Sequence, residues 1–154
     1  MEIEKKFLVK QLPEHLEQED SVPIEQGYLN VKPVIRIRRL GDSYILTYKA
    51  KQDGNKDVCV NEEVELPLTK EAYEHLKTKI DGCLVEKTRY RIQYNKHCIE
   101  LDLFHGKYEG MILAEVEFSS VEEADSFEKP DWFGENVSED YHYTNAYLAM
   151  KDEE

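Results

Sequence analysis

Short segments in which charged and apolar residues alternate recur along the whole chain. In the first of them, residues 1–9, the side chains of Glu2, Glu4 and Lys6 share one face of a predicted strand, and apolar residues such as Phe7 occupy the other. Such a charged face is a poor surface for an ordinary core. Taken alone, the segment is equally compatible with an edge strand whose charges face water.

Seven further strands are predicted, and nearly all of them have one charged and one apolar face. They span residues 24–30, 34–40, 43–51, 58–66, 84–94, 98–104 and 111–118, the last of which is expected to end the sheet. The charged faces are acidic on some strands and basic on others. A sheet whose polar face simply met water would mix in Ser, Thr and Gln. The pattern therefore favours an antiparallel barrel with a charged interior and helices packed outside, an α+β fold that is mainly β.

The helices predicted to cover the barrel are short. A change to helical period over residues 68–79 follows the N-cap candidate Thr69, and Asp81-Gly82 is expected to end this helix. Ser120 is expected to start a second helix, and residues 138–150 to contain a third. Residues 11–23 are predicted to form a connector with a short helix, residues 52–57 a turn or loop, and residues 130–137 an irregular aromatic segment.

Composition limits the class of protein. A chain of 154 residues fits one domain, residues 1–154, and its hydrophobic fraction of 40% indicates a globular fold. The formal charge of −13 argues against nonspecific binding to nucleic acid or to an anionic membrane. Cys59, Cys83 and Cys98 show no paired spacing, which predicts reduced thiols, and no apolar run is long enough for a membrane span. A cytoplasmic protein is expected.

The basic faces indicate a polyanion as ligand. Guanidinium groups grip phosphate oxygens through two hydrogen bonds at once, and several cations converging on one cavity suit a triphosphate. The residues concerned are Arg36, Arg38, Lys49, Lys51, Lys87, Arg89 and Arg91.

The acidic faces indicate a hard divalent cation, because Mg²⁺ and Mn²⁺ prefer oxygen ligands and can bridge to substrate oxygens. Lys6 lies close to these positions and could act as a base. The competing interpretation is a set of cross-strand salt bridges on a solvated sheet, which becomes less plausible when six or seven strands repeat the same segregation. The acidic candidates are Glu2, Glu4, Glu63, Glu65, Glu100, Asp102, Glu115 and Glu117.

With these residues in view, the chain resembles the CYTH superfamily, the triphosphate tunnel metalloenzymes. The opening EIEKKF is similar to the family's E-x-E-x-K motif, and VIRIRRLGDSYILTYKAK to its R-x-R strand, turn and lysine strand. EEVEL, EKTRYR, IELDLF and AEVEF follow in the family's order. VSEDYHYTNAYLA resembles the final segment, where His142 stands at a position that often carries a basic residue.

The resemblance implies an eight-stranded antiparallel closed barrel that holds a triphosphate at its centre and uses Mg²⁺ or Mn²⁺. Lys6 would be the base that activates water. The implied phosphate ligands are Arg36, Arg38, Lys49, Lys87, Arg89 and Arg91. The implied metal ligands are Glu2, Glu4, Glu115 and Glu117, supported by Asp102 and Glu100. Lys51, Glu63 and Glu65 would tune or pair with the others.

Among the activities known in this superfamily, the compact chain resembles the bacterial inorganic triphosphatases most. Class IV adenylate cyclase and thiamine triphosphatase remain alternatives. A non-catalytic polyphosphate-binding module is a further alternative, although such a module could dispense with Lys6 or with part of the acidic set, and this chain keeps both. The expected partner is a small-molecule triphosphate, and a monomer and a homodimer are both compatible with the sequence.

Overall fold

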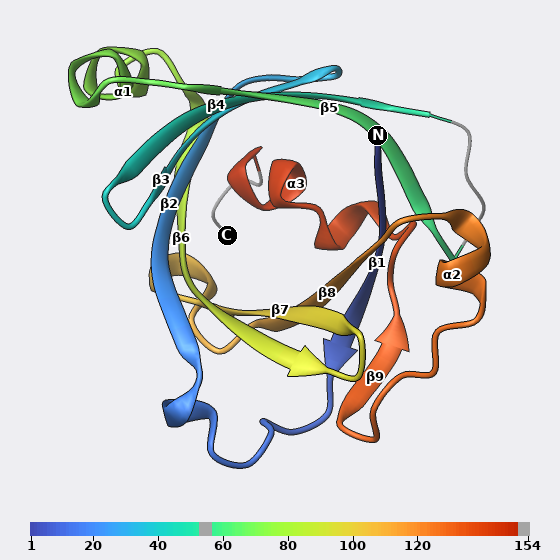
Figure 1. Cartoon of the computed structure of the whole chain (residues 1–154). Helices are drawn as coiled ribbons and strands as arrows, with labels where there is room; N and C mark the ends of the chain where they lie inside the picture. Colours follow the sequence, from blue (N-terminus) through green and yellow to red (C-terminus); the bar gives the residue numbers. More distant parts are fainter. Residues whose placement is uncertain (53–56, 151–154) are drawn as a thin grey trace.

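The alternating strands form a closed antiparallel barrel, seen along its axis in Figure 1. The computed structural model describes residues 1–52 and 57–150. Strands follow one another around the barrel in the order β5-β4-β3-β2-β6-β7-β8-β1, and β1 pairs with β5 to close the ring. Their bounds are β1 Glu2–Val9, β2 Asp20–Val31, β3 Val34–Leu40, β4 Ser43–Lys51, β5 Cys59–Pro67, β6 Asp81–Tyr94, β7 His97–Phe104 and β8 Ile112–Phe118. The predicted eight-stranded barrel is confirmed.

A ninth strand, β9 (Phe133–Asn136), corrects the expectation that the sheet ends at residue 118 and that residues 130–137 are irregular. The first half of β1 pairs with β5 through Glu2–Glu4, which leaves the second half with a free edge. β9 pairs with that edge at Phe7 and Val9. The ninth strand therefore satisfies backbone groups that the barrel leaves open.

Two element boundaries also differ from expectation. β2 starts at Asp20, inside the predicted connector, because its first residues pair with the long strand β6. Asp81-Gly82 begins β6 instead of ending helix α1 (Lys70–Lys77). Gly82 has φ +66°, and a Cβ there would lie 2.2 Å from the carbonyl oxygen of Ala149. This glycine allows the close approach of the C-terminal helix α3 (Asn145–Met150) to β6.

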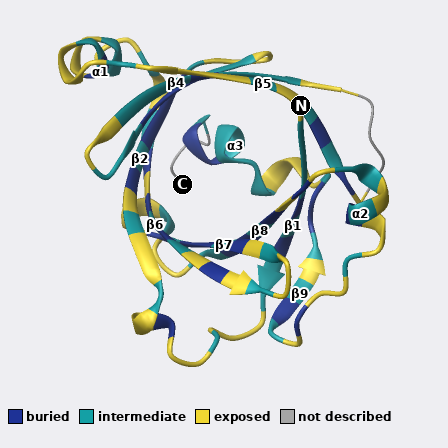
Figure 2. Ribbon diagram, in the orientation of Figure 1, coloured by how far each residue is buried: buried dark blue, intermediate teal, exposed yellow. Residues whose placement is uncertain are grey.

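Apolar residues of the strands form two clusters. One lies on the outer side of the barrel wall, where Phe7, Leu101 and Val116 pack with Ala124 of helix α2 (Val121–Asp125) and with Phe133 of β9. Figure 2 shows buried residues concentrated along β7 and β8, whereas β5 is largely exposed or half-buried. Helices α1 and α2 lie outside the ring of strands, as expected. The predicted N-caps are confirmed, since the Thr69 and Ser120 side chains accept hydrogen bonds at the two helix starts.

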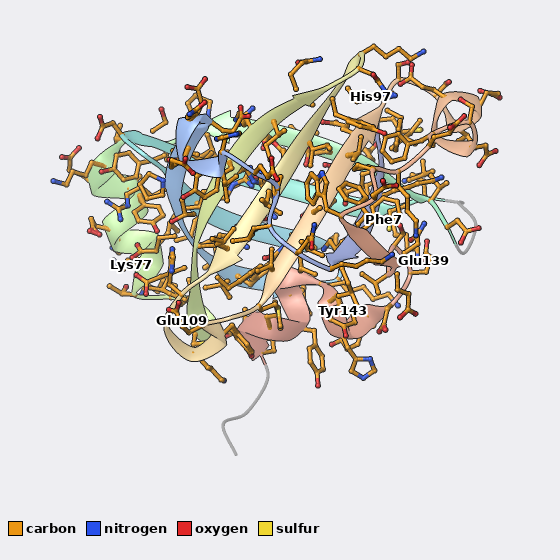
Figure 3. The ribbon with its side chains drawn as sticks, turned by 90° about the horizontal axis from the view of Figure 1, so that it is seen from below. Phe7, Lys77, His97, Glu109, Glu139 and Tyr143 are labelled. Atoms are coloured by element: carbon orange, nitrogen blue, oxygen red, sulfur yellow. The ribbon has the colours of Figure 1, made fainter. Side chains whose placement is uncertain are left out.

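The second apolar cluster closes one end of the barrel. Tyr28, Val85 and Leu113 pack there against Leu148 and Ala149 of α3, which lies across the ring of strands and not on its outside. Figure 3 shows α3 at the same end as the labelled Tyr143, with His97 at the opposite end. The short helices η1 (Leu16–Gln18), η2 (Gly106–Tyr108) and η3 (Tyr141–Tyr143) complete the fold. Over the described residues, no helix is long and apolar enough to cross a membrane.

Candidate active site inside the barrel

The inner faces of the strands enclose a cavity of about 690 Å³. Residues that are far apart in the sequence meet there because strands alternate their side chains between lumen and exterior. The segment that precedes and opens α3 supplies one wall through Tyr141, Thr144 and Asn145. Every predicted site residue except Asp102 lines this cavity, namely Lys6, Arg36, Arg38, Lys49, Lys51, Lys87, Arg89, Arg91, Glu2, Glu4, Glu63, Glu65, Glu100, Glu115 and Glu117.

Arg36 and Arg38 present two guanidinium groups from the inner face of β3. The residues are 6% and 8% exposed, and the Nε atom of each is buried with no hydrogen-bond partner in the part of the chain that the structure describes. Arg38 Nη2 donates to Glu65 Oε2 at 3.0 Å, whereas Arg36 makes no ion pair with any residue in the described ranges. Burial lowers the pKa of Arg38 to about 10, and the charges of Arg36 and Arg89 contribute. Buried, incompletely paired guanidinium groups of this kind are well suited to an anion.

A buried cluster of Lys87, Arg89 and Asp102 joins β6 to β7. Arg89 donates from Nε and Nη2 to the two carboxylate oxygens of Asp102 at 2.8 and 2.9 Å, and Lys87 Nζ lies 2.7 Å from Asp102 Oδ2. Burial raises the pKa of Asp102, but the charges of Lys87 and Arg89 outweigh it and leave that pKa lowered. Both oxygens are thus engaged.

Lys87 has a second partner in the wall formed by α3. Its Nζ donates to Asn145 Oδ1 at 3.2 Å, and its side chain is 1% exposed. Burial lowers the pKa of Lys87 to about 8 despite the neighbouring Asp102. The amine therefore lies in a position where a phosphate anion would stabilise its charged form.

Carboxylates from β1 and β8 face the lumen side by side, with Glu4 opposite Glu117 and Lys6 opposite Glu115 in the pairing register. Burial, together with the negative charges of Glu115 and Glu2, raises the pKa of Glu4 well above its usual value. Burial also raises the pKa of Glu115, but Lys6 and the neighbouring cations outweigh it, and a hydrogen bond with Glu4 lowers that pKa further.

Glu4 and Glu115, here called the carboxylate pair, offer oxygen donors of the kind that a hard divalent cation prefers. Within residues 1–52 and 57–150, no three His, Cys, Asp or Glu side chains are arranged to hold an ion by themselves. Mg²⁺ is often held by one or two carboxylates and completes its shell with water and substrate oxygens. A cation would also relieve the repulsion that raises the pKa of Glu4. Glu4 and Glu115 therefore fit such an ion as a partial site that a phosphate ligand would complete.

Lys6 lies at the edge of the carboxylate pair. Its Nζ donates to the carbonyl oxygen of Tyr143 at 3.0 Å and lies 3.9 Å from Glu115 Oε1. The backbone of Lys6 is also fixed, because its N–H donates to Ser138 Oγ at 2.9 Å. The predicted base is consequently held from both its backbone and its amine.

The remaining predicted residues form ion pairs around the cations of the cavity. Lys49 Nζ lies 2.9 Å from Glu2 and 3.5 Å from Glu63; burial lowers its pKa, but Glu4 and Glu2 raise it above the usual value overall. Glu100 bridges Arg89 at 3.3 Å and the half-exposed Arg91 at 3.8 Å. The exposed Lys51 pairs with Glu139. Lys51 and Glu63 thus each form an ion pair with a neighbouring side chain.

The C-terminal segment contributes two contacts whose roles the sequence did not specify. Tyr143 and Asn145 lie in the stretch VSEDYHYTNAYLA, which resembles the family's final segment, and the Tyr143 carbonyl and the Asn145 amide accept from Lys6 and Lys87. His142, which stands at the often basic position of that segment, has a side chain that is 69% exposed and contacts Asp140. Gln26, on the inner face of β2, is fully buried and was not identified from the sequence.

Comparison with known proteins gives a consistent result. Residues 1–149 match the model of the CYTH domain family. An inorganic triphosphatase of Nitrosomonas europaea is 37% identical over 153 residues, covering 97% of both chains. An inorganic triphosphatase of Acetivibrio thermocellus is 34% identical and covers 96% of this chain and 92% of its own.

Solved structures agree on the fold. A crystal structure of an inorganic triphosphatase superposes with a TM-score of 0.71 at 36% identity and covers 99% of this chain and 96% of its own. A proposed adenylyl cyclase from Hippeastrum with a dominant triphosphatase activity has a TM-score of 0.63 at 14% identity, covering 81% of this chain and 83% of its own. At that identity the second likeness concerns the fold alone.

Proposed function

The chain belongs to the CYTH domain family, and we propose that its barrel hydrolyses inorganic triphosphate to pyrophosphate and phosphate. One observation carries the proposal. Guanidinium groups with unpartnered Nε atoms and a carboxylate pair that favours a cation line the same cavity, from strands on opposite sides of it. The reaction needs both of these, because phosphoryl transfer depends on positioning and on neutralising charge.

The cations of β3 and β6 are proposed to hold the phosphate chain. Arg36 and Arg38 offer donors that the described protein groups leave free, and Asp102 fixes Arg89 and Lys87 in place. A triphosphate between the two strands would lie beside these cations in the cavity. Arg91, at the exposed end of the same face, would guide the anion inward.

Glu4 and Glu115 are proposed to hold a Mg²⁺ or Mn²⁺ ion, with Glu2 and Glu117 close enough in register to assist through water. Such an ion would polarise a phosphoryl oxygen and neutralise charge on the substrate. Asp102 is left out of this set, because its oxygens already accept from Arg89 and contact Lys87.

The proposed chemical step is attack of water on a terminal phosphorus. The water oxygen forms a bond to phosphorus, the bond from phosphorus to the bridging oxygen breaks, and its electron pair leaves on pyrophosphate. Lys6 is the proposed acceptor of the water proton, and the reaction requires its amine to be neutral at that moment. Its contacts with Tyr143 and Glu115 hold Nζ beside the carboxylate pair.

Phosphate release tests this function. Purified protein would be given inorganic triphosphate, ATP or thiamine triphosphate, each with Mg²⁺, Mn²⁺ or a chelator, and ATP reactions would also be analysed for cAMP. We expect inorganic triphosphate to be hydrolysed fastest and the chelator to abolish turnover. Formation of cAMP would identify a cyclase, and preference for thiamine triphosphate would move the assignment to that substrate. Tight triphosphate binding without turnover would indicate a binding module.

The cytoplasm is the proposed location of this reaction, because Cys59, Cys83 and Cys98 are free thiols, which a reducing compartment preserves.

A further inference from the structure

Gln26 is the buried polar side chain whose hydrogen-bonding capacity is most completely unused in the described structure. The residue is 0% exposed, and both Oε1 and Nε2 lack a hydrogen-bond partner. Most buried side-chain polar atoms in proteins have a hydrogen-bond partner, because a buried polar atom without one costs free energy. A buried amide with neither its donor nor its acceptor engaged therefore indicates a contact that forms in another state of the protein.

The position of Gln26 shows which groups it can reach. It pairs with Arg38 on β3 and with Val85 on β6, and both of these neighbours belong to the inner face of the barrel. Directly opposed residues of antiparallel strands have Cβ atoms roughly 5 Å apart. The next inner residue of β2, Tyr28, pairs with Arg36. Gln26 thus lies beside the two arginines whose Nε atoms are themselves buried and unpartnered.

The backbone on either side of Gln26 is held in place. A Cβ on Gly27 would lie 2.9 Å from atoms of Ile80, so the outer face of β2 is packed tightly at this point. Tyr28, 2% exposed, packs in the cluster under α3. Any rearrangement near Gln26 is consequently confined to side chains. The amide oxygen of Gln26 is a hydrogen-bond acceptor, and the arginine Nε–H groups are donors.

From this arrangement we infer that Gln26 is a positioning residue for the arginine pair: its Oε1 accepts from Arg38 Nε when the Arg38 guanidinium leaves Glu65 and turns to a phosphate anion. The Glu65 side chain is 43% exposed, which makes it the easier partner to release. A neutral amide fixes the guanidinium without cancelling the positive charge that the anion requires. This inference deepens the proposed function and rests on it.

Two substitutions test the inference, with kinetics on inorganic triphosphate and thermal unfolding measured on each. Gln26→Met keeps the length of the side chain and removes its polar atoms. We expect KM to rise about tenfold, the effect of one hydrogen bond to a charged group, with kcat changed less than about threefold. The melting temperature should stay equal or rise, because an unsatisfied buried amide has been removed. Gln26→Glu should raise KM further, since a carboxylate would hold the arginines away from the anion.

The matched control removes a contact between helix α1 and the outer face of the same strand. Tyr73 Oη donates to Glu25 Oε1 at 2.7 Å, and Tyr73→Phe should lower the melting temperature while leaving KM unchanged. An unaltered KM in Gln26→Met, or a lower melting temperature together with wild-type kinetics, would overturn the inference and assign the amide a structural role. These outcomes are distinct from failure of the proposed function, in which wild-type protein itself would not hydrolyse triphosphate.

Discussion

Lys87 Nζ lies 2.7 Å from Asp102 Oδ2, and each of the two side chains is 1% exposed. Removing one member of a buried ion pair leaves the other charged in a poorly solvated place, which costs about 3 kcal/mol or more. Asp102→Asn should therefore lower the free energy of unfolding by about 3 kcal/mol, measured by denaturant titration. The exposed Asp131→Asn should have no such effect, and equal unfolding midpoints for the two variants would show that the pair is not stabilising.

The charge on Lys87 should make substrate capture depend on pH. Burial lowers the pKa of Lys87 to about 8, so the amine is protonated below that pH and neutral above it. Because a neutral amine cannot neutralise phosphate, kcat/KM for triphosphate should fall as the pH rises through 8. In Lys87→Arg, whose guanidinium stays charged, this fall should disappear. If kcat/KM still fell through pH 8 in Lys87→Arg, the pH dependence would belong to another group.

Glu4→Gln should separate stability from activity. The pKa of Glu4 is raised in the folded protein, so its ionised form is favoured in the unfolded chain and opposes folding at neutral pH. A neutral amide removes this penalty, and the melting temperature should stay equal or rise while metal-dependent turnover is lost. Stabilisation by Mn²⁺ in thermal unfolding should vanish as well. Glu62→Gln, on an exposed position of β5, is the control, and retained turnover in Glu4→Gln would eliminate the metal assignment.

The two faces of β3 allow a direct comparison of arginines. Arg36, on the inner face, is buried and makes no ion pair with any described residue, whereas Arg39 lies on the outer face. Arg36→Ala should raise KM for triphosphate about tenfold or more without lowering the melting temperature, because it deletes a buried charge that the protein leaves uncompensated. Arg39→Ala should leave KM unchanged. Similar kinetics in the two variants would remove Arg36 from the substrate site.

Lys6→Met tests the proposed base. A positioned general base contributes roughly 10²–10⁴-fold to the rate, so kcat should fall by that factor while KM changes only a few-fold. Lys10→Met, at the exposed position that follows β1, serves as the control. A small loss of kcat in Lys6→Met would mean that another group accepts the proton.

Most of the barrel could be predicted because its signal is local. The period-two pattern assigns each residue to the lumen or the exterior, and the side chains of Thr69 and Ser120 mark helix starts within four residues of sequence. Strand β9 could not be found in this way. Its four residues pair with a stretch of β1 that is free only because β5 covers the other half.

In the candidate site, too, local sequence patterns predicted some features and tertiary pairing decided others. Sequence placed nearly all charged residues of the cavity correctly, since each lies on the inner face of its strand. It could not separate Asp102, which contacts two cations, from Glu4, whose pKa is raised by burial and by the charge of Glu115, because strand neighbours are set by register.

By itself, then, the sequence determined the closed barrel, its charged interior and the chemistry that the interior can support, because alternation along a strand is a property of adjacent residues. Tertiary structure alone decided which charges neutralise one another, which lysines are held by Tyr143 and Asn145 of the C-terminal segment, and which atoms of Gln26, Arg36 and Arg38 are left without partners. Pairing and burial depend on contacts between segments as much as 137 residues apart, and no local pattern encodes them.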